Sequence, residues 1–227
     1  MKLSSKTPRA VLVSGLIACG ALIGPAAAMA VSTTVSPAGH TLRIDPHSVS
    51  FGIANLGEST CTMNASTAVI PSAPANHNGS GGIGMPFSIR PTFSSCTVTG
   101  GTLPTPVTTS GNWTIMLTGT NPATATVYVP AGGFTYRFDW PAPYGCSSTN
   151  TSAFTLTGTW TNGTLVPFSK SKIANQSLTA SVPMQRVSGP YPPSNLCVGN
   201  MYGWYTNASP LAVGDLTAPA SLITVTP

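Results

Sequence analysis

The stretch that decides the fold is Phe134-Thr135-Tyr136-Arg137-Phe138-Asp139-Trp140, in which aromatic and polar residues alternate without interruption. Successive side chains of a β-strand point to opposite faces, so this pattern places the aromatic rings on one face and the polar side chains on the other. One face is then suited to a protein core and the other to water. The stretch therefore predicts an amphipathic β-strand.

The same two-residue alternation recurs at 113–117, 154–160 and 178–184. The 22 prolines and 23 glycines fall mainly between such segments, where they form turns and protect strand edges. After the N-terminal region no segment has the apolar periodicity of a helix. The pattern predicts an all-β protein of about ten strands, an antiparallel β-sandwich with Greek-key-like connections, running from near Thr41 to the C-terminus.

A tight hairpin is predicted at Asn162-Gly163, since Asn-Gly is the sequence that a type I′ turn favours. In that hairpin Trp160 lies opposite Leu165. Both side chains are then expected on the core side of the sheet.

The first thirty residues have the composition of an export signal. Three basic residues come first, and a nearly apolar run from Ala10 to Ile23 follows. Glycines and Pro25 interrupt this run, so it is a poor membrane anchor, and no later stretch is long enough to span. The sequence predicts a signal peptide over 1–30 that forms a cleaved helix.

Two processing sites compete within that signal. Ala28 and Ala30 stand three residues and one residue before Val31, in the small-residue pattern that signal peptidase recognises, so cleavage before Val31 is favoured. The alternative is a lipoprotein box ending at Cys19, which would be lipidated. The favoured interpretation gives a single secreted domain, 31–227, that is extracellular or associated with the cell surface.

Removal of the signal changes the charge of the protein. Three of the nine basic residues lie in it, which leaves six against four acidic residues. Nucleic-acid binding requires clustered Lys and Arg, and the remaining charges show no such cluster. The sequence therefore predicts no nucleic-acid partner.

Four cysteines remain after cleavage: Cys61, Cys96, Cys146 and Cys197. An even number in an exported chain indicates two disulfides, and four cysteines allow three pairings. The pairs Cys61–Cys96 and Cys146–Cys197 are favoured because each joins neighbouring strands or their loops. No closely spaced pair of cysteines or histidines suggests a metal site, and no cofactor is expected.

Several of these residues form a pattern typical of a known group. The pattern comprises the segments 60–62, 93–97, 111–113, 145–146, 158–162 and 197–199, which hold the four cysteines and the turn sequences around them. The chain resembles secreted, disulfide-bonded β-sandwich proteins of high-GC Gram-positive (actinobacterial) bacteria. The resemblance covers most of the chain after the signal. It implies a fold and an extracellular location, and it implies no activity.

Catalytic chemistry has little support. Gly-x-Ser-x-Gly is absent, and the only close Asp–His pair, Asp45 and His47, flanks a proline turn. A hydrolase would need two carboxylates among Asp45, Glu58, Asp139 and Asp215 to meet in one pocket. The sequence gives no reason to pair any two, so a non-enzymatic protein is expected.

Aromatic residues near the C-terminus are the candidate ligand-binding residues: Tyr191, Tyr202, Trp204 and Tyr205. Rings beside short amides suit glycan stacking, whereas rings near a disulfide often only cover it. Three hypotheses follow: a structural or ligand-binding protein of the cell envelope, with a glycan-binding, lectin-like or adhesin-like module over 191–205 as one form; a secreted hydrolase with an unusual carboxylate site; and a subunit that self-associates through an apolar face or an open strand edge.

Overall fold

The computed structural model describes residues 32–54, 57–78, 85–98, 105–139, 145–165, 168–178, 180–191, 199–206 and 210–227. All regular structure in these ranges is β-strand, and every ladder between strands is antiparallel. The all-β, antiparallel class is therefore confirmed. The helix expected in the signal segment lies outside the described residues.

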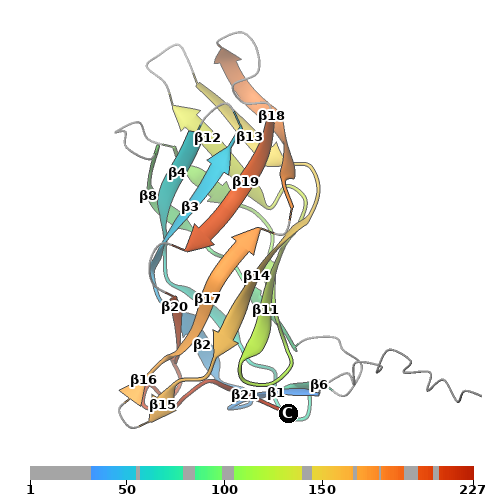
Figure 1. Ribbon diagram of the computed structural model, residues 1–227, viewed down its shortest axis with the longest axis vertical. Helices are drawn as coiled ribbons and strands as arrows, with labels where there is room; N and C mark the ends of the chain where they lie inside the picture. Colours follow the sequence, from blue (N-terminus) through green and yellow to red (C-terminus); the bar gives the residue numbers. More distant parts are fainter. Residues whose placement is uncertain are drawn as a thin grey trace, which may run out of the picture.

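Two eight-stranded sheets form the body of the protein. The lower sheet in Figure 1 contains, in spatial order, β5 (Ser66–Val69), β2 (Thr41–Ile44), β20 (Leu211–Asp215), β17 (Ser171–Leu178), β14 (Phe154–Thr161), β11 (Ala123–Val129), β10 (Trp113–Thr118) and β7 (Met85–Ile89). The upper sheet contains β8 (Phe93–Val98), β4 (Gly57–Met63), β3 (His47–Ile53), β19 (Gly199–Thr206), β18 (Val182–Tyr191), β13 (Gly145–Asn150), β12 (Phe134–Asp139) and β9 (Val107–Thr109).

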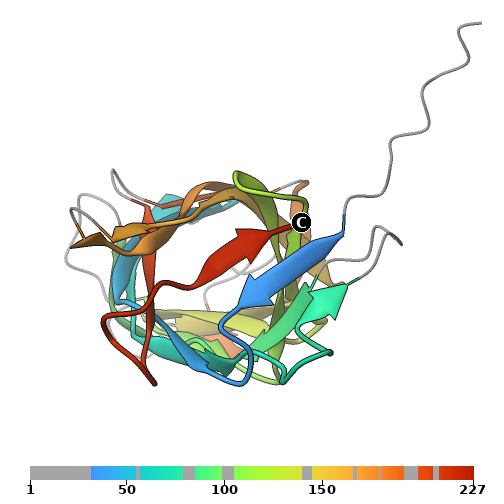
Figure 2. The same ribbon diagram turned by 90° about the horizontal axis from the view of Figure 1, so that it is seen from below.

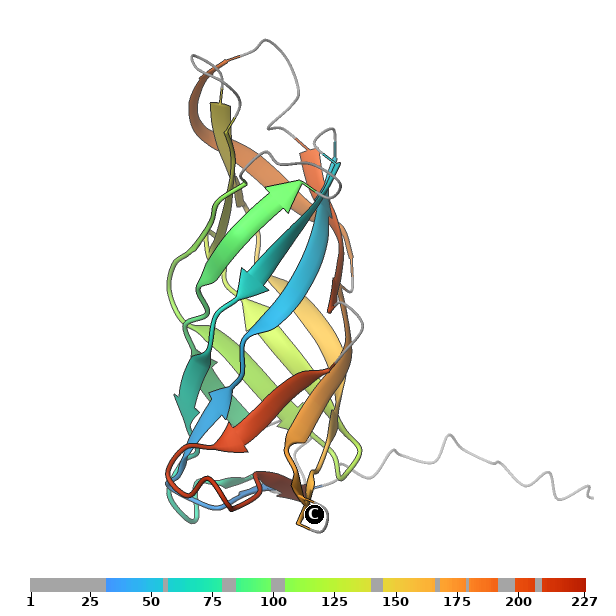
Figure 3. The ribbon, with the colours of Figure 1, turned by 90° about the vertical axis from the view of Figure 1, so that its left-hand side faces the viewer.

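Each strand of one sheet continues, after a short break, into a strand of the other. β2 leads into β3, β4 into β5, β7 into β8, and the remaining strands follow the same scheme. The first and last strands of the wall pair with each other in both sheets, β2 with β20 and β3 with β19, and the outermost strands approach each other, β5 beside β7 and β8 beside β9. The two sheets together make one elongated, nearly closed, barrel-like wall of obliquely running strands (Figures 1 and 3).

This arrangement differs from the expected sandwich with Greek-key-like connections. Pairs such as β3–β4, β10–β11 and β12–β13 join strands that follow one another in the chain, and the chain crosses from one sheet to the other at breaks such as that between β2 and β3. Such breaks divide the described chain into 21 strands, more than the ten or so that the sequence predicted. They hold residues that cannot continue a ladder, such as Pro46, Pro91, Pro130 and the positive-φ glycines Gly111 and Gly132.

A third sheet lies across the lower end of the wall (Figure 2). It contains β21 (Thr224–Thr226), β1 (Thr33–Ser36) and β6 (His77–Asn78). Val35, Ile223 and Val225 of this region are buried, so the sheet and the segment before it close the core from below. We call this end of the protein the basal end. A small hairpin, β15 (Thr164–Leu165) with β16 (Phe168–Ser169), projects beside it.

The predicted alternation is confirmed at 113–117, 134–138 and 154–160, but the prediction for 178–184 is wrong, because β17 ends at Leu178, β18 begins at Val182 and Ala180 between them is exposed. Phe134, Tyr136 and Phe138 are buried while Arg137 is exposed, and β10 and β14 have the same pattern. The side chains of Asp139 and Trp140 lie outside the described residues. The inward side chains around Phe87 and Trp160 pack closely, and the cavity among them measures about 10 Å³.

The predicted hairpin at Asn162-Gly163 is wrong. Trp160 pairs with Ala123 and Ile173, and Leu165 pairs with Phe168 in the separate β15–β16 hairpin. Asn162 instead links elements, because its amide accepts a hydrogen bond from Trp160 Nε1 and donates one to the carbonyl of Val225. Leu165 consequently lies on the surface and not in the core.

Candidate binding pocket at the basal end

A pocket of about 280 Å³ lies on the outside of the wall near the basal end. Strands β2 and β20 pair there, with Arg43 opposite Gly214, and β17 follows beside them. The lining residues are Arg43, Asp45, Lys170, Gly214, Asp215, Leu216 and Pro219. Charged and apolar side chains therefore share one concave surface, which is the usual composition of a specific binding site.

Asp45 is the centre of the charged part of this pocket. Its Oδ2 lies 2.5 Å from Lys170 Nζ, and its Oδ1 lies 3.4 Å from Arg43 Nε. The two cations remain nearly half exposed, and the carboxylate is one-quarter exposed. One carboxylate thus serves two cations, which leaves N–H groups of both directed at solvent or a ligand.

Gly214 provides the space for this arrangement. A Cβ at position 214 would stand 3.4 Å from Cδ and Cε of Lys170, so the lysine chain lies closely along the glycine backbone. Lys170 immediately follows β16 and precedes β17, and the cross-strand position of Gly214 directs it toward Asp45. A Cβ alone at 214 would make ordinary van der Waals contact with the lysine, whereas a bulkier side chain would compete with it for this space.

Asp215 is the second carboxylate of the pocket, and it is already bound. Its side chain has no exposed surface; Oδ2 lies 2.7 Å from Nδ1 of His40, and Oδ1 accepts a hydrogen bond from the N–H of Ala218. Burial acts to raise its pKa, but the hydrogen bonds from Ala218, His40 and Thr217 and the charge of His40 outweigh burial, so the pKa is lowered. Asp215 is therefore ionised and closes the turn after β20.

Asp45 and Asp215, which the sequence offered to a hydrolase, are both lining residues of one pocket, but of the two carboxylates only that of Asp45 has exposed surface. Hydrolysis with a carboxylate pair needs one member that donates a proton and access for both to the substrate. The buried, ionised Asp215 provides neither. What the pocket presents is a set of hydrogen-bond donors on Arg43 and Lys170 around one acceptor, with Leu216 and Pro219 as an apolar border.

The aromatic residues selected from the sequence do not form one surface. Trp204 was predicted at an exposed ligand-binding site, but it is 2% exposed. Its ring stacks on Phe51 at 5.7 Å between centroids and meets Phe93, Trp113 and Phe134 edge-on. Trp204 therefore belongs to the core, because it lies on the inward face of β19.

Tyr202 lies on the opposite, outward face of β19 and is 49% exposed. Its ring rests against Gly52 of β3, to which it is paired across the ladder. A register shift between Tyr202 and Trp204 accompanies this change of face. The side chains of Tyr191 and Tyr205 lie outside the described residues.

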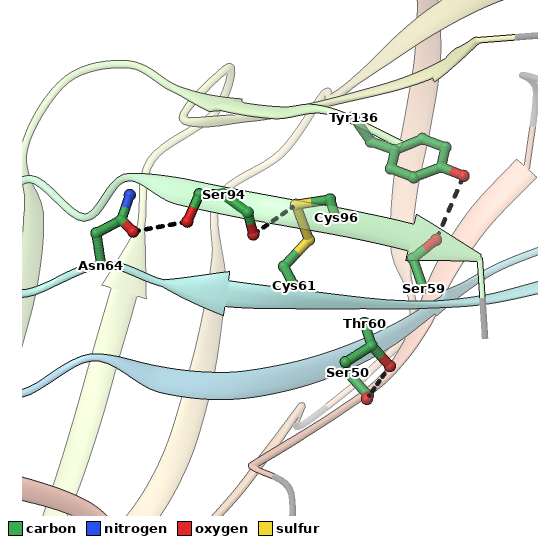
Figure 4. Close-up of a disulfide and its surroundings, with 8 residues drawn as sticks. All are labelled: Ser50, Ser59, Thr60, Cys61, Asn64, Ser94, Cys96 and Tyr136. Carbon is green, nitrogen blue, oxygen red and sulfur yellow. Dashed lines mark hydrogen bonds between the residues drawn. A yellow bond between two sulfur atoms is a disulfide. The ribbon is translucent and has the colours of Figure 1, made fainter. Parts of the chain in front are cut away.

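The disulfide Cys61–Cys96 is confirmed and joins the adjacent strands β4 and β8 inside the wall (Figure 4). Ser94 Oγ donates to Asn64 Oδ1 at 2.7 Å beside it, and Ser50 and Thr60 exchange a hydrogen bond at 2.9 Å. Burial raises the pKa of the nearby Tyr136 to about 12, against the opposing effect of a hydrogen bond with Ser59.

The second predicted pair is described only in part. Cys146 lies on β13 and is disulfide-bonded. Cys197 lies outside the described residues, so the pairing Cys146–Cys197 stays a prediction.

Sequence reasoning missed the cations of the pocket. Lys170 lies 125 positions from the Asp45 that it binds. No local motif connects residues so far apart. The close pair Asp45 and His47 is also separated in function: Asp45 faces the pocket, whereas His47 Nε2 is buried without a hydrogen-bond partner, and burial lowers the His47 pKa.

Comparison with protein-family models, with curated proteins and with solved structures found no match to this chain. Within the described ranges no group of three His, Cys, Asp or Glu side chains is placed to hold a metal ion. Across the same residues, none of the secondary structure is a helix with the length and apolar character needed to cross a membrane.

Proposed function

We propose that the chain is an extracellular, non-enzymatic binding protein that holds an acidic glycan of the cell envelope in the basal pocket. The observation that carries the proposal is the shared carboxylate: Arg43 and Lys170 both bind Asp45 and both keep exposed N–H groups. A sugar bearing carboxylate or phosphate groups would accept hydrogen bonds from these cations, while its hydroxyl groups would donate to Asp45. Leu216 and Pro219 would contact the apolar face of a sugar ring.

The chemistry of the pocket favours binding over hydrolysis. Asp215 has a lowered pKa and no exposed side-chain surface, so it is unsuited to act as a general acid. Asp45 is bound by two cations, Lys170 at Oδ2 and Arg43 at Oδ1. A hydrolase remains the competing function, and turnover of any bound glycan by the wild-type protein would support it.

The test is binding of the purified chain from Val31 onward to a panel of bacterial glycans, neutral and acidic. Retention of acidic glycans, and loss in the variant Arg43→Gln with Lys170→Gln, is the expected result. The control is Lys172→Gln, which removes one positive charge two residues after Lys170 but outside the pocket lining. Equal retention by the pocket variant, or preference for neutral glycans, would contradict the proposal.

A second candidate for glycan contact is Tyr202. Its ring is half exposed and is held in place by contact with Gly52, as suits a ring that stacks on a sugar. In the same panel, Tyr202→Ala would abolish binding if the 191–205 segment is the recognition site. Retained binding in Tyr202→Ala together with loss in the Arg43 and Lys170 variant assigns the site to the basal pocket.

Export is part of the same proposal. The sequence of residues 1–30 and the Cys61–Cys96 disulfide both support an extracellular location, and so does the resemblance to secreted actinobacterial proteins. N-terminal sequencing of the secreted protein should begin at Val31, whereas lipidation at Cys19 would retain the protein in the membrane fraction. Non-reducing peptide mapping should recover Cys146 joined to Cys197.

A further inference from the structure

Exposed apolar side chains gather at the basal end. Six large apolar or aromatic side chains are exposed among the described residues, and two of these, Tyr128 and Tyr202, carry a hydroxyl group. The remaining four have no polar group and are 48% to 61% exposed: Val69, Leu165, Phe168 and Leu216. Scattered single residues of this kind need no explanation, but four at one end of an elongated protein do.

The four residues occupy two adjoining positions at that end. Leu165 and Phe168 face each other across the β15–β16 hairpin, which projects from the wall in Figure 1. Val69 pairs with Thr41, whose carbonyl accepts a hydrogen bond from the N–H of Leu216. Val69 and Leu216 thus flank Thr41, the residue at which β2 begins. The hairpin lies near Leu216, because Lys170, which directly follows β16, lines the same pocket as Leu216.

Cationic side chains lie next to the apolar ones, farther along the strands from the basal end. Arg43 follows Thr41 by two residues, or roughly 7 Å along the strand. Lys170 and Lys172 follow the hairpin in the same way and are exposed. Asp45 is the exposed carboxylate side chain of this region, and it is bound by Arg43 and Lys170; that of Asp215 is buried. The described part of the basal end is therefore apolar at its tip and cationic behind the tip.

We propose that the basal end docks on a lipid surface that carries acidic headgroups. Leu165 and Phe168 enter the boundary between headgroups and acyl chains, with Val69 and Leu216 at its edge. Arg43, Lys170 and Lys172 then lie at the depth of the headgroups and bind their phosphates. This contact is peripheral and goes beyond glycan binding, because it depends on Leu165 and Phe168, which do not line the pocket.

Charge distinguishes a lipid surface from a second copy of the chain. In a symmetric contact between two copies the same surface meets itself, so the cations of one copy would face those of the other. Four exposed side chains are also few for a stable protein interface, which buries about 20–30 residues on each side. An acidic lipid surface has neither disadvantage.

The experiment measures co-sedimentation of the chain from Val31 onward, which contains every described strand, with phosphatidylglycerol-containing and with pure phosphatidylcholine vesicles. We expect binding to the acidic vesicles that weakens with salt. The variant Leu165→Ser with Phe168→Ser should bind them at least about tenfold more weakly, given the apolar surface removed. Tyr128→Ser, an exposed aromatic residue distant from the basal end, is the matched control and should bind as the wild type does.

A second measurement does not depend on loss of function. Trp113, Trp160 and Trp204 are buried, so Phe168→Trp adds an exposed indole whose emission should shift to shorter wavelength when acidic vesicles are added. An unshifted emission, equal binding by the serine variant, or equal binding to both vesicle types would overturn the proposal. Dimerisation in sedimentation that the serine variant abolishes would assign the surface to a second copy instead.

Each of the two proposals, glycan binding and lipid docking, can be contradicted without the other. The serine variant should keep glycan binding, because none of its substitutions lines the pocket. Lys172→Gln should keep glycan binding and weaken vesicle binding. Vesicle binding without glycan binding would leave the docking surface in place and remove the proposed function.

Discussion

The ring of Tyr202 rests against Gly52 and occupies the place where a Cβ at position 52 would stand. The two residues are partners in the β3–β19 ladder. A glycine in a strand normally weakens a sheet, since it has no side chain to pack. Here the neighbouring ring covers the bare backbone, so an exposed tyrosine and a buried glycine form one unit on the outside of the wall.

Gly52→Ala should displace the Tyr202 ring and lower the free energy of unfolding by about 1–3 kcal/mol, the usual cost of overpacking. Denaturant unfolding of the single variants and of Gly52→Ala with Tyr202→Ala provides a double-mutant cycle. The alanine at 52 should cost less when the ring is absent. An identical cost in both backgrounds would show that the contact is not the cause.

The two aromatic residues of β19 should respond differently to truncation. Trp204→Ala removes a ring from the centre of the aromatic core and should cost about 3–5 kcal/mol. Tyr202→Ala removes a ring from the surface and should cost about 1 kcal/mol or less. Thermal or chemical unfolding measures both. Equal costs would mean that Trp204 is not packed as described.

The Cys61–Cys96 disulfide should contribute substantially to stability. It closes a loop with a sequence separation of 35, for which the chain-entropy treatment gives about 4 kcal/mol. Cys61→Ser with Cys96→Ser should lower the free energy of unfolding by an amount of this order under non-reducing conditions. A variant as stable as the wild type would show that the cross-link constrains the unfolded chain little.

Stability should fall in acid through Asp215. Its pKa is below the ordinary value of 3.8 in the folded protein, so the stabilisation is complete above that value and is lost as the pH falls through the lowered folded pKa. Asp215→Asn should be less stable than the wild type at neutral pH, and the difference should shrink as the pH falls below about 4. Unfolding measured from pH 7 to pH 2 tests this, and a difference independent of pH would contradict it.

The sequence predicted individual strands well, but it did not predict that the strands close into one barrel-like wall. Alternation in Phe134–Phe138 and Trp113–Leu117 identified strands and their buried faces, because that information lies in consecutive residues. Whether the strands divide into two stacked sheets or wrap into one wall depends on breaks such as Asp45-Pro46 and Ser110–Asn112, where one long strand passes between sheets. A proline or a glycine at such a break looks the same in sequence as one in a hairpin turn.

The binding pocket shows the same limit more sharply. Asp45 and Asp215 were recognised as candidates because acidic residues are few, yet their partners Lys170 and His40 come from distant parts of the chain. Trp204 and Tyr202 were assigned to one surface because they are close in sequence, and a register shift in β19 sends them to opposite faces. Ring type and spacing do not reveal such a shift.

The two places where the wall lacks a ladder do not join. In the lower half the unpaired neighbours are β5 and β7, and in the upper half they are β8 and β9, so the two openings flank the β7–β8 strand on opposite sides. If strands separate at either opening, the separation meets hydrogen-bonded strands halfway along the protein. In the described chain no full-length strand edge is therefore offered to a neighbouring molecule, and any growth of sheet from one protein to the next would have a template of only half a strand.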